Sequence, residues 1–266
     1  MTALVTGASG GLGRRMRERI GAQGLCRENA NDFFAGRERF DLVVHCAHSR
    51  KKDVTQFGLA EYLEDSVELT KKTLALCEGT YVLASSISVY PLDGHSLNED
   101  DPILLDVVPT FYGVAKLMSE AAAREWARKT SGRLIILRLS SLLGAYSPPN
   151  VTMRILSGAA DEVPLTATSL FNYLTHDEVC DFTVQAIEDR AEGVFNLAAG
   201  DSVALERVAA LANRTIRFGA IHYAAPTPPI DRAAARFPSL RRPSEARIQH
   251  AIKRIAAEPP QPPPPL

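Results

Sequence analysis

The chain has 266 residues, of which 45% are hydrophobic and 23% are charged, and its net charge is −1. A chain of this size and composition buries one large core, or a core and a small lobe, as globular proteins do. The net charge gives no overall basicity that would favour binding to the phosphate backbone of a nucleic acid. The longest apolar runs are much shorter than a membrane span, and Met1 leads into a predicted strand without a signal-peptide pattern. We therefore expect a cytoplasmic protein that contacts neither nucleic acid nor a membrane.

The four cysteines are far apart in the chain and form no CxxC pair. Such spacing favours reduced thiols in the core over disulfides or a metal site. We therefore expect no bound metal at these positions, which are Cys26, Cys46, Cys77 and Cys180.

Short apolar runs alternate with helical patterns along much of the chain, which predicts βαβ units and a parallel sheet. The predicted strands are apolar on both faces, as in sheets that helices cover on each side. They are residues 3–5, 42–46, 81–84, 134–139 and 194–197. The predicted helices are residues 12–20, 59–76, 111–128, 176–187 and 204–212. The expected fold is an α/β protein with a doubly wound parallel sheet of the Rossmann type.

The alternation of strands and helices breaks near residues 147–150, and the stretch that follows is irregular as far as residue 174. This break predicts a small, mixed C-terminal lobe that would bind the substrate. The predicted domains are residues 1–146 with 193–199 for the dinucleotide, and residues 147–192 with 200–253 for the substrate.

The tail of the chain, residues 258–266, is rich in proline and lacks most backbone donors. This composition predicts an extended polyproline II segment. We expect the segment to lie in solvent, and a proline-recognising partner is the alternative.

The first predicted strand runs directly into a glycine-rich turn, TGASGGLG at residues 6–13, that opens a helix. Its three spaced glycines suit a phosphate-binding loop. The first permits a tight turn, the second admits a pyrophosphate, and the third lets helix and strand pack closely. An ordinary glycine-rich turn is the alternative. The residues predicted to contact a dinucleotide here are Gly7, Ser9, Gly10, Gly11, Leu12 and Gly13.

No carboxylate clearly ends a second strand after the glycine-rich turn, and Arg27 follows a short Gly-Leu-Cys segment instead. A carboxylate there favours the ribose hydroxyl of NAD, whereas an arginine meets the 2′-phosphate of NADP. Arg27 therefore favours NADP over NAD, and a plain surface charge is the alternative. Asp32 is a candidate acceptor for the adenine amino group, or a cap for a helix that starts there.

Tyr112 and Lys116 stand four residues apart on one face of a predicted helix. A phenol titrates near about pH 10, so a tyrosine that exchanges protons at neutral pH needs positive charge beside it. A lysine and an oxidised nicotinamide supply that charge, and the lysine also suits the nicotinamide ribose. An exposed helical pair is the alternative. Serine hydroxyls at 85, 86 and 88 follow a predicted strand at the carboxyl edge of the sheet, where doubly wound folds build their sites.

Taken together, these motifs resemble the extended short-chain dehydrogenase/reductases, a family that includes enzymes acting on nucleotide sugars. The resemblance rests on the order of the glycine-rich turn, DLVVHCAH at 41–48, SSISVY at 85–90 and YGVAK at 112–116. It continues through RLSSLLG at 138–144, NYLTHDEV at 172–179 and VFNLAA at 194–199, and so covers nearly the whole chain.

The resemblance implies a role for each matched residue. Tyr112 would be the general acid/base, Lys116 its electrostatic partner, and Ser86 the hydroxyl that holds the substrate carbonyl. The other implied contacts are Ala47, His48, Leu139 and Ser140 for the cofactor, and Ser88 and Ser141 for the substrate. Because relatives pair two long helices across a twofold axis, a homodimer through residues 59–76 and 111–128 is expected.

The sequence departs from this family at positions that concern the substrate. Ser66 replaces a usual asparagine, and Phe171 with Asn172 replaces a usual Arg-Asp pair whose arginine often grips a nucleotide diphosphate. The candidate replacements for that arginine are Arg154, Arg236, Arg241 and Arg242. These changes bear on the substrate and leave the chemistry intact.

The resemblance implies an NAD(P)-dependent oxidoreductase or epimerase of a sugar, above all a nucleotide-linked sugar. Two alternatives stay open: a reductase of a non-nucleotide ketone or aldehyde, and a dinucleotide-sensing regulatory protein without turnover. Dehydration is not expected, because dehydratases of the family carry an Asp-Glu pair where this chain has Ile87 and Ser88. Neither side chain exchanges a proton near neutral pH.

Overall fold

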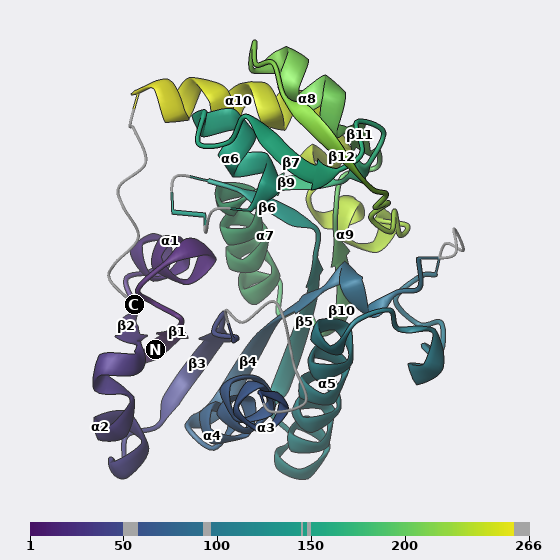
Figure 1. Cartoon of the computed structure of the whole chain (residues 1–266). Coiled ribbons are helices and arrows are strands. Elements are labelled where there is room, and N and C mark those ends of the chain that lie inside the picture. The colour runs from purple at the N-terminus through teal and green to yellow at the C-terminus, as the bar shows by residue number, and fades with distance from the viewer. Residues whose placement is uncertain (50–57, 93–96, 145, 148–149, 258–266) are drawn as a thin grey trace.

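A six-stranded parallel sheet forms the centre of the chain, whose computed structural model describes residues 1–49, 58–92, 97–144, 146–147 and 150–257. The order of the strands across the sheet is β2-β1-β3-β4-β5-β10 (Figure 1). Their bounds are Gln23–Leu25 (β2), Ala3–Thr6 (β1), Phe40–His45 (β3), Cys77–Ser86 (β4), Arg133–Leu139 (β5) and Gly193–Leu197 (β10). The chain order reverses between β1 and β3, and doubly wound folds bind ligands at the carboxyl ends of such a pair.

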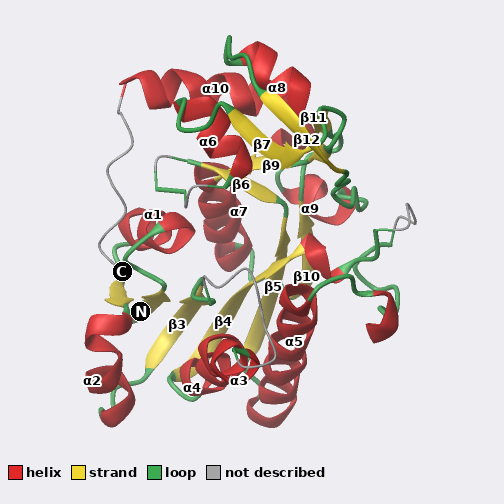
Figure 2. Cartoon of the chain, in the orientation of Figure 1, coloured by secondary structure: helices red, strands yellow, loops and turns green. Residues whose placement is uncertain are grey.

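Helices cover both faces of the sheet, because successive strand residues point to opposite sides and both sides are apolar (Figure 2). Val5 and Val82 belong to one buried cluster, with residues of α1 (Gly11–Ile20), α7 (His176–Glu188) and α9 (Asp231–Arg236). Leu4 and Leu83 belong to the other, with residues of α2 (Ala30–Ala35), α4 (Leu69–Leu74) and α5 (Phe111–Thr130). The expected α/β fold with a doubly wound parallel sheet is confirmed.

The five predicted strands all occur in the sheet, with shifted ends, but β2 was not predicted as a strand. β2 has three residues, of which only Leu25 is buried, so it carries almost no hydrophobic signal. It forms because the edge of β1 offers unpaired backbone groups, and Leu4, Val5 and Thr6 pair with its three residues. β4 is also longer than predicted and begins at Cys77.

The predicted helix over residues 59–76 is wrong in its detail. The structure divides it into α3 (Leu59–Leu63), a π-helical segment (Glu64–Glu68) and α4, which ends at Leu74. Single π-helical turns inside α-helices are frequent at functional sites, because the extra residue turns side chains out of register. Here the π-helical segment contains the buried Ser66.

Beyond the carboxyl edge of the sheet, the C-terminal part of the chain forms a mixed lobe of short strands and helices (Figure 1). Three two-stranded sheets pair β6 with β9, β7 with β12, and β8 with β11. Its strands are Ser141–Leu143 (β6), Glu162–Leu165 (β7), Leu170–Phe171 (β8), Tyr173–Thr175 (β9), Val203–Ala204 (β11) and Arg217–Ile221 (β12). Its helices are Val151–Ser157 (α6), Leu205–Leu211 (α8) and Ser244–Ala257 (α10).

The lobe has a buried apolar cluster of its own, which includes Met153, Tyr173 and Ile248. α7, by contrast, buries Val179 and Phe182 in the cluster of the sheet. The exact division into two domains stays a prediction. The proline-rich tail, residues 258–266, lies outside the described residues. No helix among the residues that the structure describes is long and apolar enough to cross a membrane.

Candidate active site

The glycine-rich turn adopts a conformation that depends on its glycines. Gly7 has φ +67° and Gly11 has φ +52°, in the left-handed region that side chains disfavour. A Cβ at Gly13 would lie 2.3 Å from the carbonyl oxygen of Gly7, and a Cβ at Gly7 would lie 3.0 Å from the backbone nitrogen of Ala47. The turn therefore brings the start of α1 close to the end of β1 and to the segment after β3.

The amino end of α1 carries no acidic residue in its first turn. Free backbone N–H groups and the helix dipole make such an end attractive to anions. The Gly11 N–H donates to the carbonyl of Tyr146 at 3.0 Å, and the Arg14 guanidinium lies 4.0 Å from the centre of the Tyr146 ring. A segment leading into the lobe thus rests on the glycine-rich turn.

The three predicted catalytic residues meet at the carboxyl edge of the sheet. Ser86 is the last residue of β4, and Tyr112 and Lys116 lie one turn apart at the start of α5. The Thr110 hydroxyl caps that helix by accepting from the Gly113 N–H at 3.1 Å. The Lys116 ammonium donates to the carbonyl of Ala84 at 2.8 Å, which ties α5 to β4.

Burial shifts the pKa of both groups on α5 that would move or stabilise a proton. It raises the pKa of Tyr112 to about 12, although a hydrogen bond with Ser86 acts in the opposite direction. It lowers the pKa of Lys116 to about 8, although the negative charge of Glu120 opposes the shift. At neutral pH the phenol is therefore a proton donor beside an ammonium that is still mostly charged.

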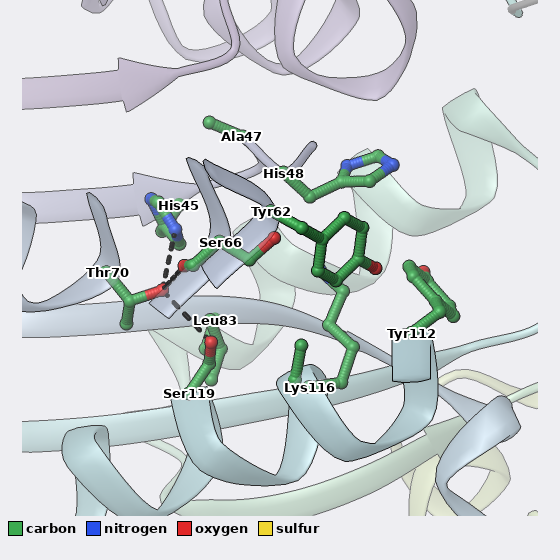
Figure 3. Close-up of a pocket in the computed structure, with 11 residues that line it drawn as sticks. His45, Ala47, His48, Tyr62, Ser66, Thr70, Leu83, Tyr112, Lys116 and Ser119 are labelled. Atoms are coloured by element: carbon green, nitrogen blue, oxygen red, sulfur yellow. Dashed lines mark hydrogen bonds between the residues drawn. The ribbon is translucent and has the colours of Figure 1, made fainter. Parts of the chain in front are cut away.

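The pocket beside Tyr112 and Lys116 is lined by the end of β3 and the residues that follow it, by the helical segments between β3 and β4, by β4 itself, and by α5 (Figure 3). His48 meets the ring of Tyr112 edge-on, with 6.0 Å between ring centres. Burial lowers the pKa of His45 to about 3, so this imidazole is neutral, and it hydrogen-bonds Thr6 at 2.8 Å. The lining residues are His45, Ala47, His48, Tyr62, Ser66, Thr70, Leu83, Tyr112, Ala115, Lys116 and Ser119.

Two buried hydroxyls at this edge indicate that the site fits a polar ligand. Among the described residues, Ser66 Oγ and Ser140 Oγ are buried and have no hydrogen-bond partner. A buried polar atom without a partner costs about 1–3 kcal/mol, so such atoms mark places where a bound group completes the hydrogen bonding. Together with the glycine-rich turn and Lys116, they fit a dinucleotide that runs from α1 to the end of β5.

The remaining predicted cofactor contacts lie around this path. Leu139 ends β5, Ser140 follows it, and Ser141 begins β6 by donating its N–H to the carbonyl of Asn172 at 3.1 Å. The Arg27 side chain is 81% exposed and its guanidinium lies 3.3 Å from the Asp65 carboxylate. Asp32 lies in the first turn of α2, which begins at residue 30, so the alternative that Asp32 caps this helix is wrong.

The predicted substrate contacts are more scattered. Ser88 lies in a short 3-10 turn after β4 and donates its N–H to Ser86 Oγ at 3.1 Å. Arg154 lies in the lobe helix α6 and is half-buried. Asn172 is used structurally: its side-chain amide donates to the Ala199 carbonyl at 2.6 Å and its oxygen accepts from the Ala199 N–H at 2.7 Å.

Sequence reasoning missed Tyr62 and Tyr223, two phenols close to Tyr112. Both act electrostatically on the pKa of Tyr112 and raise it. Tyr223 follows β12 and packs on Phe171, with 4.9 Å between ring centres. The Tyr223 backbone N–H donates to the Ser169 hydroxyl at 3.1 Å, and this hydrogen bond holds Tyr223 against the segment that contains Phe171. No motif surrounds Tyr223 in the sequence, so only the folded chain shows it.

The profile of the NAD dependent epimerase/dehydratase family matches residues 24–198, about two thirds of the chain. The matched stretch contains Ser86, Tyr112 and Lys116, while the glycine-rich turn precedes it. The chain therefore belongs to this family of the extended short-chain dehydrogenase/reductases.

Individual relatives are distant. The chain is 23% identical over 186 residues to dTDP-4-dehydro-6-deoxyglucose reductase of Escherichia coli, an alignment that covers 65% of this chain and 58% of that protein. The alignment thus spans little more than half of the curated relative.

Solved structures resemble the chain over almost its whole length. MoeE5 in complex with UDP-glucose and NAD is 20% identical, with a TM-score of 0.82 and coverage of 97% of this chain and 99% of that chain. The RMD of Pseudomonas aeruginosa, complexed with NADPH, is 17% identical, with a TM-score of 0.74 and coverage of 97% and 99%. At these identities the likeness shows a shared fold.

Proposed function

We propose that the chain is an NAD(P)-dependent oxidoreductase or epimerase that acts on a carbonyl or hydroxyl carbon of a nucleotide-linked sugar. The observation that carries the proposal is the junction of Ser86, Tyr112 and Lys116 beside a glycine-rich turn at the switch point of the sheet. Family membership and the nucleotide-sugar complexes of similar structures support it.

We propose one task for each of these residues. When bound, the nicotinamide ring supplies or accepts the hydride. In the reductive direction the Tyr112 hydroxyl gives its proton to the substrate carbonyl oxygen as that oxygen becomes a hydroxyl. The Ser86 hydroxyl holds the same oxygen, and the Lys116 ammonium stabilises the phenolate that Tyr112 becomes. In the oxidative direction the proton returns to Tyr112.

For the cofactor we keep the preference for NADP over NAD. Arg27 lies two residues after β2, at the start of a 3-10 turn, near the place where the adenosine ribose of a dinucleotide binds in this class of fold. Its ion pair with Asp65 is at the surface, and such pairs contribute little, so a phosphate can replace that partner. Similar structures contain either NAD or NADPH, so the assay described below uses both cofactors.

We also propose that the enzyme does not dehydrate its substrate. Elimination of water needs one group that takes a proton from carbon and another that gives a proton to the leaving hydroxyl. Ile87 is buried and apolar, and the Ser88 hydroxyl does not exchange a proton near neutral pH. The two positions after Ser86 therefore supply neither the base nor the acid.

A homodimer through α3–α4 and α5 completes the proposal. Phe111 and Met118 of α5 are 57% and 43% exposed, which leaves apolar surface on the helix that relatives use for pairing. Light scattering at micromolar concentration tests it, and a monomer would reject it.

A second candidate is a reductase of a ketone or aldehyde without a nucleotide. It is favoured by the aromatic pair of Phe171 and Tyr223, which puts ring surface in the lobe where a diphosphate would need cationic donors. A third, a dinucleotide sensor, would bind cofactor without any turnover.

One assay distinguishes the three candidates. The purified chain is mixed with NADPH or NADH and a panel of nucleotide-linked 4-keto sugars and simple ketones and aldehydes, and cofactor oxidation is followed by absorbance. In parallel, NAD⁺ and nucleotide hexoses are incubated and analysed for epimers and for 4-keto-6-deoxy products. Turnover of nucleotide sugars supports the first candidate, turnover of simple carbonyls alone supports the second, and cofactor binding without turnover supports the third. A 4-keto-6-deoxy product would contradict the exclusion of dehydration.

A further inference from the structure

A buried carboxylate lies one helical turn beyond Lys116. Tyr112, Lys116 and Glu120 are spaced four residues apart and share the face of α5 that packs on the sheet. Glu120 is 0% exposed. A carboxylate at this depth is costly unless strong partners surround it, so its surroundings call for a functional or structural reason.

Two partners of Glu120 come from the strands that end at the active site, and a third, Arg124, lies one turn further along α5. One carboxylate oxygen accepts from the Ser85 hydroxyl at 2.6 Å and from Arg138 Nε at 3.1 Å. The other accepts from Arg138 Nη2 and from Arg124, each at 2.9 Å. Ser85 and Arg138 are paired neighbours in β4 and β5, and the next pair in register is Ser86 and Leu139.

The network continues across the sheet. Arg138 Nη1 donates to the Tyr90 hydroxyl at 2.8 Å, and this hydroxyl donates to Asn196 Oδ1 in β10 at 2.7 Å. Ser85, Arg138, Tyr90 and Asn196 are each at most 3% exposed. Every member thus has partners, and the network connects α5 to the carboxyl ends of three strands.

We propose that Glu120 is a positioning residue of the active site: it clamps α5 to the ends of β4 and β5 and holds a negative charge behind the Lys116 ammonium. The clamp keeps the ammonium on the Ala84 carbonyl, whose neighbour Ser85 is itself bound to Glu120. The proposal rests on the proposed function of Lys116, and Glu120 itself contacts no reacting atom.

The charge of Glu120 persists at neutral pH. Burial acts to raise the pKa of Glu120, but the hydrogen bonds and charge of Arg138 outweigh it, and the pKa is lowered overall. At Lys116, burial lowers the pKa while the charge of Glu120 raises it, and the Cys46 thiol is neutral in this range because burial raises its pKa to about 12. Among the described residues, the other titratable side chains that line the pocket with Lys116 are the neutral His45 at the end of β3, Tyr62 of α3, Tyr112 and His48.

Removing the charge of Glu120 should therefore change the titration of Lys116. In Glu120→Gln the side chain keeps its shape and one acceptor, but the ammonium loses its nearby negative charge and faces an uncompensated Arg138. The charged form of Lys116 becomes less stable, so its pKa falls further below the ordinary value. The expected shift is roughly 0.5–1 pH unit downward.

The primary measurement does not need a substrate. The ¹³Cε resonance of Lys116 is followed by NMR as a function of pH in lysine-labelled full chain and assigned by its absence in Lys116→Arg. Glu125→Gln is the matched control, because Glu125 lies on the same helix, is 55% exposed and pairs with Lys129. We expect a lower midpoint in Glu120→Gln and an unchanged midpoint in Glu125→Gln.

Where a substrate is known from the assay above, the alkaline limb of the reductive kcat/KM should move to lower pH by the same amount. If Glu120→Gln does not fold, the same NMR test compares the double variant Glu120→Gln/Arg138→Gln, in which neither of these two buried charges is left without the other, with Arg138→Gln, which keeps Glu120 and should have the higher midpoint. A folded Glu120→Gln variant whose Lys116 midpoint equals that of the wild type, or a double variant whose midpoint equals that of Arg138→Gln, would overturn the proposal, even if the variant were less stable. Absence of turnover in the wild type and in every variant would contradict the proposed function. The NMR titration would still decide the proposal for Glu120, because it needs no substrate.

Discussion

The carboxyl edge of the sheet and the C-terminal lobe use their polar residues differently. At the edge, Lys116, Ser85 and Glu120 are buried and held by short hydrogen bonds to neighbouring strands. In the lobe, the half-buried rings of Phe171 and Tyr223 pack on one another, and the side chain of Asn172 is hydrogen-bonded to the backbone. We therefore propose that the edge carries the reaction and that the lobe selects among substrates. Variants on each side should therefore affect different kinetic constants.

The largest effect is expected from the phenol at the edge. Tyr112→Phe keeps the ring and deletes the proton donor, so turnover should fall by roughly 10²–10⁴ while cofactor affinity changes little. Steady-state kinetics and calorimetry measure the two quantities. Tyr81→Phe, a buried tyrosine of β4 outside the pocket, is the control and should keep its activity. Wild-type turnover in Tyr112→Phe would mean that another group is the acid.

A second large effect is expected at the glycine-rich turn. Gly10→Val puts a branched side chain where the pyrophosphate would approach the amino end of α1, so dinucleotide affinity should fall by at least about 100-fold in a folded protein. Gly200→Ala is a suitable control, since a Cβ there has its nearest neighbour 3.9 Å away. Unchanged affinity by calorimetry would show that the cofactor does not use this turn.

The pH profile tests the electrostatics of the edge. The charged form of Lys116 is present below its pKa of about 8 and is lost as pH rises through that value. The reductive kcat/KM should thus be level at neutral pH and fall by about tenfold per unit above the pKa. A profile that stays level to pH values near the ordinary lysine pKa would show that Lys116 is not needed in its charged form.

A smaller effect is expected where the two cofactors differ. Arg27→Ala should weaken NADPH binding by roughly 10-fold and leave NADH nearly unaffected, because only NADPH carries a phosphate for the guanidinium. Arg37→Ala removes another exposed arginine from the same region and should alter neither affinity. Equal losses for both cofactors in Arg27→Ala would remove Arg27 from the site.

The smallest effect belongs to the lobe. Phe171→Ala removes one ring of the aromatic pair and should raise KM by roughly 2- to 10-fold with a lesser change in kcat. Tyr223→Phe keeps both rings and separates ring packing from the hydroxyl. A fall in kcat that matched the rise in KM would mean that the lobe takes part in the chemistry as well as in selection.

The fold and the edge of the site could be predicted because their residues repeat local patterns. Strands such as β5 are apolar on both faces, and Tyr112 and Lys116 are joined by one helical turn. β2 was missed because its pairing with β1, and not its own residues, makes it a strand. Glu120 and Tyr223 were missed because their importance depends on partners far away in the chain. The π-helical segment at Ser66 has no sequence pattern that distinguishes it from a regular helix.

The position of β2 at the margin of the sheet bears on how often the cofactor must leave. Among the described residues, this three-residue strand is the only one beyond β1, at the edge where we expect the adenosine half of a dinucleotide to bind. An epimerase returns the hydride to the substrate it came from and gains by retaining its cofactor through many cycles. A reductase consumes one reduced cofactor in each cycle and gains by rapid exchange. Net reduction therefore requires cofactor dissociation at least as fast as turnover, whereas epimerisation does not, and measuring the two rates would separate the two chemistries.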